Sequence, residues 1–140
     1  MPKPIAPAKG IAFAFPDVCW TPISPTSEVP LPYPNIAKLE DASDKTNISV
    51  AEFVVGSDES YVLLGGGTID TSTGDEAGSG GGVLNGRKVA DLCEIVQASQ
   101  TVLYGPDGQG IVRFMDKTSQ NAGNADGHVL SSFPSVIIGD

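Results

Sequence analysis

Short apolar runs separated by turn residues recur along most of this chain. The clearest runs hold between four and seven residues each: Ser49–Val55, Ser60–Leu64, Thr101–Tyr104, Ile111–Met115 and Ser135–Asp140. Runs of this length with turns between them are typical of β-strands. The pattern therefore predicts an all-β fold, a small domain of short strands and tight turns with little helix.

Two segments near the beginning of the chain, Phe15–Pro22 and Val29–Ile36, mix prolines with apolar residues. Proline fixes its own φ and pushes the preceding residue into extended geometry, so helix is excluded in both segments. In the second segment a proline at every second position removes every other backbone donor. Such a strand can pair fully on one side only, which predicts a place at the edge of a sheet.

The remaining segments carry weaker signals. A turn at Gly105–Gly108 between Thr101–Tyr104 and Ile111–Met115 predicts a β-hairpin. The polar segment Ala37–Ser49 predicts a short helix or a turn, and Lys88–Gln97 fits either a strand or a short helix. Two further stretches predict loops: Gly74–Val83 and Asn121–Gly127.

Composition strengthens the β interpretation. Glycine supplies 17 and proline 11 of the 140 residues, so together they make up 28, or one residue in five. Neither residue is favoured inside a helix, which excludes a helical bundle. The apolar share of 40% is too high for a disordered chain. The length favours one domain, residues 1–140.

The formal net charge is −9, from 8 basic and 17 acidic residues. A phosphate-binding surface needs clustered Lys and Arg, so we expect neither nucleic acid nor an anionic membrane surface as a partner. The apolar stretch Ile11–Phe15 is too short for a secretory leader, and no apolar run approaches the roughly 18 residues of a membrane span. We therefore expect no signal peptide and no stable membrane insertion.

Catalytic motifs are weak. Ser79 lies in a Gly-Ser-Gly sequence and His128 could serve it as a base, but the strand–turn–helix context of a nucleophile elbow is missing. Asp75 and Glu76 are adjacent, so on a strand they would point to opposite faces, whereas acid–base catalysis needs carboxylates that converge. A turn carboxylate is the simpler role for this pair. Gly81–Gly86 lacks the hydroxyl of a phosphate-binding loop. We expect no enzymatic activity.

Three segments resemble landmarks of the PAAR-like domain family. They are Phe15–Pro22 with Val29–Ala37, Gly74–Val83 and the looser Gly110–Asn121, so the resemblance spans about residues 11–124. The landmark residues are Pro16, Asp17, Cys19, Pro32, Tyr33, Pro34, Asn35, Gly74, Asp75, Glu76, Ala77 and Gly78.

The resemblance implies a small cone of short β-strands with a structural function. Such a cone caps and sharpens the trimeric VgrG-type β-helical spike of a type VI secretion system or a related contractile injection system, one tip per trimer. It aids membrane puncture and effector delivery. Since the sequence stops at Asp140, we expect a tip without a fused toxin, or one that recruits cargo non-covalently. The protein would reside in the bacterial cytoplasm before firing and then be exported at the tip of the apparatus.

The resemblance also bears on metal binding. Tips of this kind commonly hold a metal ion near the apex through several histidines and a cysteine. Relatives often show Thr-Thr-His-Asn where this chain has Thr118–Asn121, so Gln120 replaces that histidine. Cys19 matches the Asp-Val-Cys position of the family. If zinc is present, we expect Cys19, Cys93 and His128 as its ligands, although the two cysteines could instead pair or stay buried as apolar residues.

Two other functions compete with this interpretation. A free-standing β binding module for carbohydrate or protein would use the aromatic residues Trp20, Tyr33, Tyr61 and Tyr104. An enzyme would use Asp75, Glu76, Ser79 and His128.

Overall fold

Nearly all of the regular structure is β, which confirms the predicted fold class. The computed structural model describes residues 2–47, 49–50, 53–54 and 61–140. Its strands are β1 Lys3–Ile5, β2 Ile11–Ser24, β3 Ser27–Lys38, β4 Lys45–Asn47, β5 Ser49–Val50, β6 Phe53–Val54, β7 Tyr61–Leu63, β8 Thr68–Ile69, β9 Gly81–Gly82, β10 Cys93–Ile95, β11 Leu103–Tyr104, β12 Gln109–Gly110, β13 Lys117–Gln120, β14 Ala125–Leu130 and β15 Phe133–Ile138.

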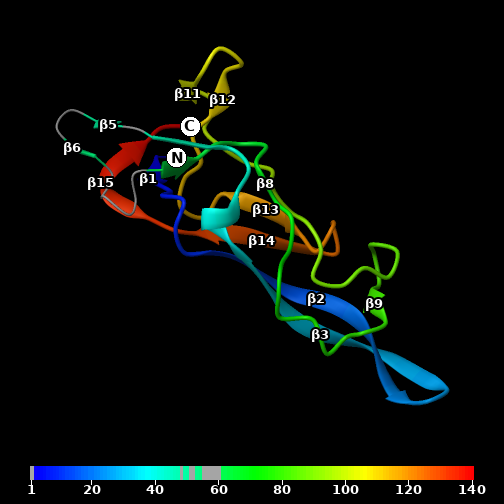
Figure 1. Ribbon diagram of the computed structural model, residues 1–140. Coiled ribbons are helices and arrows are strands. Elements are labelled where there is room, and N and C mark those ends of the chain that lie inside the picture. Colours follow the sequence, from blue (N-terminus) through cyan, green and yellow to red (C-terminus); the bar gives the residue numbers. More distant parts are fainter. Residues whose placement is uncertain (1, 48, 51–52, 55–60) are drawn as a thin grey trace.

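The main sheet has seven antiparallel strands. Six follow the order β3-β2-β14-β13-β10-β8, and β9 pairs with the far part of β2. Four two-stranded sheets complete the fold: β1–β15, β4–β7, β5–β6 and β11–β12. The long β2–β3 hairpin extends beyond the other strands, at the end of the molecule opposite the two termini (Figure 1). We call this extension the arm and the opposite end, with the termini and β11–β12, the broad end.

β3 lies at the edge of the main sheet, as its prolines predict. Ile36 exchanges two backbone hydrogen bonds of 2.8 Å with Thr73, on the side away from β2. Pro30, Pro32 and Pro34 are separated from Ile36 by even numbers of residues, so their backbone groups face the same way. The prolines therefore lie at the positions of β3 whose backbone groups point away from β2, where the pairing of β3 with β2 requires no N–H donor.

Two apolar clusters form the core. The larger lies under the main sheet, where alanines let the loops approach closely: Ala6, Ala8, Ala12, Ala37, Leu39, Ala42, Leu63, Ile69, Cys93, Ile95, Val112 and Val129. The smaller lies at the broad end: Ile5, Val62, Leu64, Ile111, Val136 and Ile138. Neither cluster includes a residue from the outer half of the arm, which needs another source of stability.

The expected hairpin is shorter than predicted. Leu103–Tyr104 and Gln109–Gly110 pair around the turn, and Ile111 still donates to the Val102 carbonyl at 3.1 Å, but Ile111 also forms a bridge with Leu64. Val112 then donates to the Leu63 carbonyl at 3.1 Å. Burial of these apolar side chains in the two clusters outweighs the local hairpin signal, because the hairpin itself is exposed.

Other local predictions have mixed outcomes. Within Ala37–Ser49 a single 3-10 turn, Leu39–Asp41, follows β3, and Lys88–Gln97 contains the strand β10 rather than a helix. The predicted loop Asn121–Gly127 is too long, because Ala125 already pairs with Gln120. Residues 51–52, 55 and 60 of two predicted strands lie outside the described residues, as do residues 56–59 between those strands. Among the described residues, no helix is long and apolar enough to cross a lipid bilayer.

Candidate functional site

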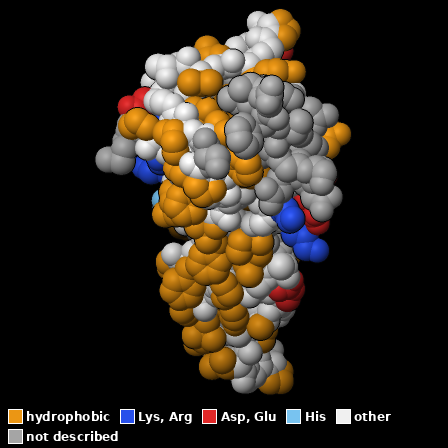
Figure 2. Space-filling model, turned by 90° about the vertical axis from the view of Figure 1, so that its left-hand side faces the viewer, with side chains coloured by type: hydrophobic (Ala, Val, Ile, Leu, Met, Phe, Trp, Pro, Cys, Tyr) orange, Lys and Arg blue, Asp and Glu red, His pale blue; other side chains and the backbone are white. Residues whose placement is uncertain are grey.

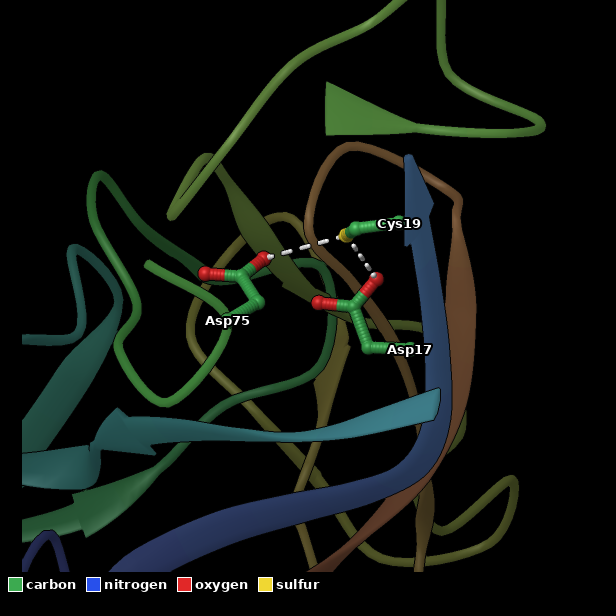
Figure 3. Close-up of side chains that lie close together, drawn as sticks. All are labelled: Asp17, Cys19 and Asp75. Carbon is green, nitrogen blue, oxygen red and sulfur yellow. Dashed lines mark hydrogen bonds between the residues drawn. The ribbon is translucent and has the colours of Figure 1, made fainter. Parts of the chain in front are cut away.

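A buried polar group lies where the arm joins the body of the sheet. Asp17 and Cys19 are two residues apart on β2 and therefore face the same side of the sheet. Asp75 approaches them from the loop between β8 and β9 (Figure 3). The Cys19 sulfur is 3.5 Å from Asp17 Oδ1 and 4.0 Å from Asp75 Oδ2. All three side chains are fully buried.

Three amide side chains surround the Asp17 carboxylate. Asn35 on β3 donates to Asp17 Oδ2 at 3.2 Å, and Asn121 donates to Oδ1, also at 3.2 Å. Asn124 donates to the same Oδ1 and, at 2.9 Å, to the Val18 carbonyl. Hydrogen bonds from several donors compensate for the loss of hydration, which is the condition for burying a carboxylate.

The amides are themselves fixed by further hydrogen bonds. Gln120, which is buried on β13, donates to Asn35 Oδ1 at 2.9 Å and accepts a 2.7 Å hydrogen bond from the Thr118 hydroxyl. Asn35 also donates to Ser72 Oγ at 2.8 Å. In the described part of the chain no buried side-chain nitrogen or oxygen lacks a partner. The glutamine at the position of the family histidine thus serves as a buried hydrogen-bonding residue.

The network ties loops as well as strands. Asn121 Oδ1 accepts from the Asp91 backbone N–H at 3.0 Å, and Asn124 Oδ1 accepts from the Leu84 N–H at 2.7 Å. Asp75 accepts from the Ala90 N–H at 3.1 Å and 3.3 Å through its two oxygens. Segments from four separate parts of the sequence therefore meet at the base of the arm.

Burial changes the ionisation of this group. Desolvation raises the pKa of Asp75 to about 7, and a hydrogen bond shared with Asp17 adds to the increase, while the Ala90 N–H opposes it. Burial, followed by the charges of Asp17 and Asp75, raises the pKa of the Cys19 thiol to about 12. Cys19 is therefore a protonated thiol at neutral pH, and Asp75 changes its charge near neutrality.

The glycines of the Gly74–Gly78 turn allow the loop to approach the arm. Gly74 has φ +112°, and a Cβ atom there would lie 2.5 Å from the Pro34 carbonyl oxygen. A Cβ atom on Gly78 would lie 2.4 Å from Cys19 Cβ. Glu76 points outward and accepts hydrogen bonds from Thr73 Oγ1 and the Gly74 N–H, which confirms that it is a turn carboxylate.

Comparison with known proteins identifies the chain. Its sequence matches the toxin PAAR-like domain family over residues 10–127. The chain belongs to the PAAR-like domain family. The matched range contains Asp17, Cys19, Asp75 and all the amides around them. No curated protein and no solved structure matches the sequence. Membership of the family supports a toxin- or spike-associated role in general terms.

Among the residues that the structure describes, Asp17, Cys19 and Asp75 form a group that could hold a metal ion, since their ligand atoms lie within 4.8 Å of one another. Of the residues predicted as zinc ligands, Cys19 belongs to this group. Cys93 lies instead on β10 in the larger apolar cluster, and His128 lies half-buried on β14 opposite Phe13. The structure does not include either of them in the group.

The PAAR-like fold places the residues of the two alternative functions in different environments. Asp75 is buried, whereas Glu76 and Ser79 are exposed. The Trp20 ring is covered by Arg87, whose guanidinium lies 5.1 Å from the ring centre, and Tyr33 forms a 2.7 Å hydrogen bond with Thr21. His128 lines a hollow beside β13 together with Lys117 and Asp126, whereas Asp75, Glu76 and Ser79 are not among the residues that line it.

Proposed function

We propose that this PAAR-like domain is a structural, non-enzymatic spike-tip protein. It would cap a trimeric VgrG-type β-helical spike of a type VI secretion or related contractile injection system and aid membrane puncture. The observation that carries the proposal is the family match over residues 10–127. The tapering shape, with the arm at one end, supports it (Figure 1).

The buried polar group supports a mechanical role. A projecting hairpin of 14-residue and 12-residue strands would bend easily if only its own ladder held it. The Asp17 carboxylate joins this hairpin to Asn121 and Asn124 from the turn between β13 and β14. A penetrating tip needs such stiffness along its axis.

The broad end is the surface that we expect to meet the spike. It exposes apolar side chains at Leu103, Tyr104 and Ile137, with 54%, 43% and 56% of their areas accessible. Exposed apolar residues grouped at one end are typical of protein–protein contacts. We propose that the arm points away from the spike and leads during firing, and that any effector cargo is recruited without a covalent link.

Purified tip and the matching spike trimer should form a complex of one tip to three spike chains, measured by size-exclusion chromatography with light scattering. Leu103→Asp at the broad end should weaken the complex by about tenfold or more, because a hydrophobic contact is lost and a charge is buried. Ile23→Asp on the arm is the matched control and should bind normally. The proposal fails if the wild-type chain binds no such trimer.

The Asp17–Cys19–Asp75 group fits a zinc ion in its donor chemistry, because thiolate and carboxylate are both zinc ligands. We propose it as the metal site in place of a histidine set. Zinc bound there would take the place of protons on Cys19 and Asp75, and the cation would offset the clustered acidic groups.

Elemental analysis of protein purified without chelators should then give one zinc per chain. Cys19→Ser should lose most of that zinc, whereas Cys93→Ser, the matched change in the apolar cluster, should retain it. Equal zinc content in both variants, or none in the wild type, would exclude this site.

A further inference from the structure

The arm exposes apolar side chains on both of its faces, since Leu31 lies opposite Cys19 on one face and Pro30 and Pro32 lie opposite Trp20 and Val18 on the other. Phe15 and Ile23 of β2 are 59% and 62% exposed, and Leu31 of β3 is 40% exposed. Five exposed prolines lie among them: Pro16, Pro22, Pro25, Pro30 and Pro32. Figure 2 shows hydrophobic side chains covering much of the narrow half of the molecule. We call these eight residues the arm surface.

We propose that the arm surface is a lipid-contacting surface that enters the interface of an uncharged, zwitterionic bilayer. The contact is reversible and interfacial, since the hairpin does not form a closed structure that could span the hydrocarbon. This inference goes beyond the spike-tip proposal, because it names the medium that the arm contacts and can be tested without any spike.

Charge is nearly absent from the arm. Between Ile11 and Ala37 the charged residues are Asp17 and Glu28. Asp17 is fully buried among its amide donors, and Glu28 forms an ion pair with Arg87, which also covers Trp20. A buried or paired charge costs less to bring to a bilayer than a free one. Of the formal net charge of −9, these two residues contribute −2 and the rest of the chain contributes −7.

The free backbone edge of the arm is also suited to an apolar medium. A strand edge normally exposes both N–H and C=O groups, and each group left unbonded in hydrocarbon costs several kcal/mol, so an edge without N–H groups carries fewer of these costs. On β3, Ile36 pairs outward with Thr73, so Pro30, Pro32 and Pro34, which lie an even number of residues away, also face outward. Proline has no backbone N–H group. The outer edge of the arm thus has carbonyl acceptors but no donors along these residues.

The same edge argues against a protein partner that adds a strand. Strand addition depends on main-chain hydrogen bonds in both directions, and a row of prolines cannot donate. A partner that packs only against side chains would still be compatible with the apolar residues. Lipid is the occupant that uses both features, the apolar side chains and the donor-poor edge.

The test uses the full chain with phosphatidylcholine vesicles. Trp20, the single tryptophan, lies on β2 of the arm and reports contact through a blue shift of its emission. We expect the wild type to float with the vesicles in a density gradient. Binding should weaken when anionic lipid is added at low salt, because the net charge of −9 is repelled.

The double variant Phe15→Ser/Ile23→Ser should bind vesicles at least about tenfold more weakly, since each change removes an exposed apolar side chain from the contact. The matched control is Leu103→Ser/Tyr104→Ser, which removes comparably exposed residues from the broad end and should bind as the wild type does. Denaturant titration of both double variants would serve as the control that they are folded.

Three outcomes would overturn the inference: no flotation of the wild type, equal loss in both double variants, or binding that requires anionic lipid. In the first case a stable complex with the spike trimer would leave the spike-tip proposal intact. Conversely, vesicle binding without spike binding would support the lipid contact and reject the spike-tip function, so the two failures are distinguishable.

Discussion

Replacing Asp17 with alanine is expected to lower the free energy of unfolding by about 3–5 kcal/mol, a large share of the stability of a domain of this size. The change removes the acceptor for Asn35, Asn121 and Asn124 while leaving their amide groups buried. Each unsatisfied buried donor costs roughly 1–3 kcal/mol. Relaxation and entering water would recover part of that sum, which is why the expected loss is smaller than three full penalties.

Urea denaturation monitored by Trp20 fluorescence measures this loss. Asp107→Ala, an exposed aspartate in the turn between β11 and β12, is the matched control and should change stability by less than about 0.5 kcal/mol. Asn124→Ala should fall between the two, since it leaves two amides on Asp17. An Asp17→Ala protein as stable as the control would show that the buried group does not hold the arm.

The features that could be predicted from the sequence are those that act locally. Proline at positions 30, 32 and 34 excludes helix and limits pairing by its own covalent structure, so the edge position of β3 follows from the sequence alone. The loop Gly74–Val83 follows in the same local way from its glycines, although Gly81–Gly82 within it forms the strand β9. The hairpin at β11–β12 was only partly predicted, because burial of Ile111 depends on residues far away in the sequence.

The buried group could not be assembled from the sequence, because its members are distant. Asp17 bonds to residues 18, 104 and 107 positions away, and no spacing rule links such positions. The family motif named Asp17, Cys19, Asn35 and Asp75 without indicating that they converge. In the sequence, Gln120 marks only a departure from a histidine motif, Asn121 matches that motif, and Asn124 carries no signal beyond its place in the predicted loop. Three amide side chains buried so close together are nevertheless costly unless they form hydrogen bonds with one another or with a charge.

The buried group has a consequence for how the domain is held together. A metal site and a hydrogen-bonded site make opposite demands on the same atoms, since a metal needs deprotonated ligands and the hydrogen bond between Asp75 and Asp17 needs a proton. The pH dependence of stability therefore distinguishes the two forms of the domain.

Metal-free protein is expected to become less stable as the pH rises from 5 to 8. The pKa of Asp75 is raised from 3.8 to about 7 in the folded state, so between these values the folded protein binds a proton that the unfolded chain has lost. Stability is fully present below 3.8 and declines until the pH has passed 7. The loss should be on the order of 2–4 kcal/mol. Cys19 does not contribute in this range, because its raised pKa of about 12 keeps the thiol protonated.

Asp75→Asn separates this effect from the titration of other carboxyl groups, because asparagine resembles the protonated acid and does not ionise. In the presence of chelator, the wild type should lose stability relative to the variant as the pH rises from 5 to 8. This change in the difference between their unfolding free energies should equal the predicted decline. With saturating zinc, the stability of the wild type should instead increase with pH. Deprotonation of the ligands becomes easier as the pH rises, and bound metal stabilises the folded chain. A difference that stays constant with pH would mean that Asp75 is ionised throughout this range. The hypothesis that the two aspartates share a proton would then be wrong.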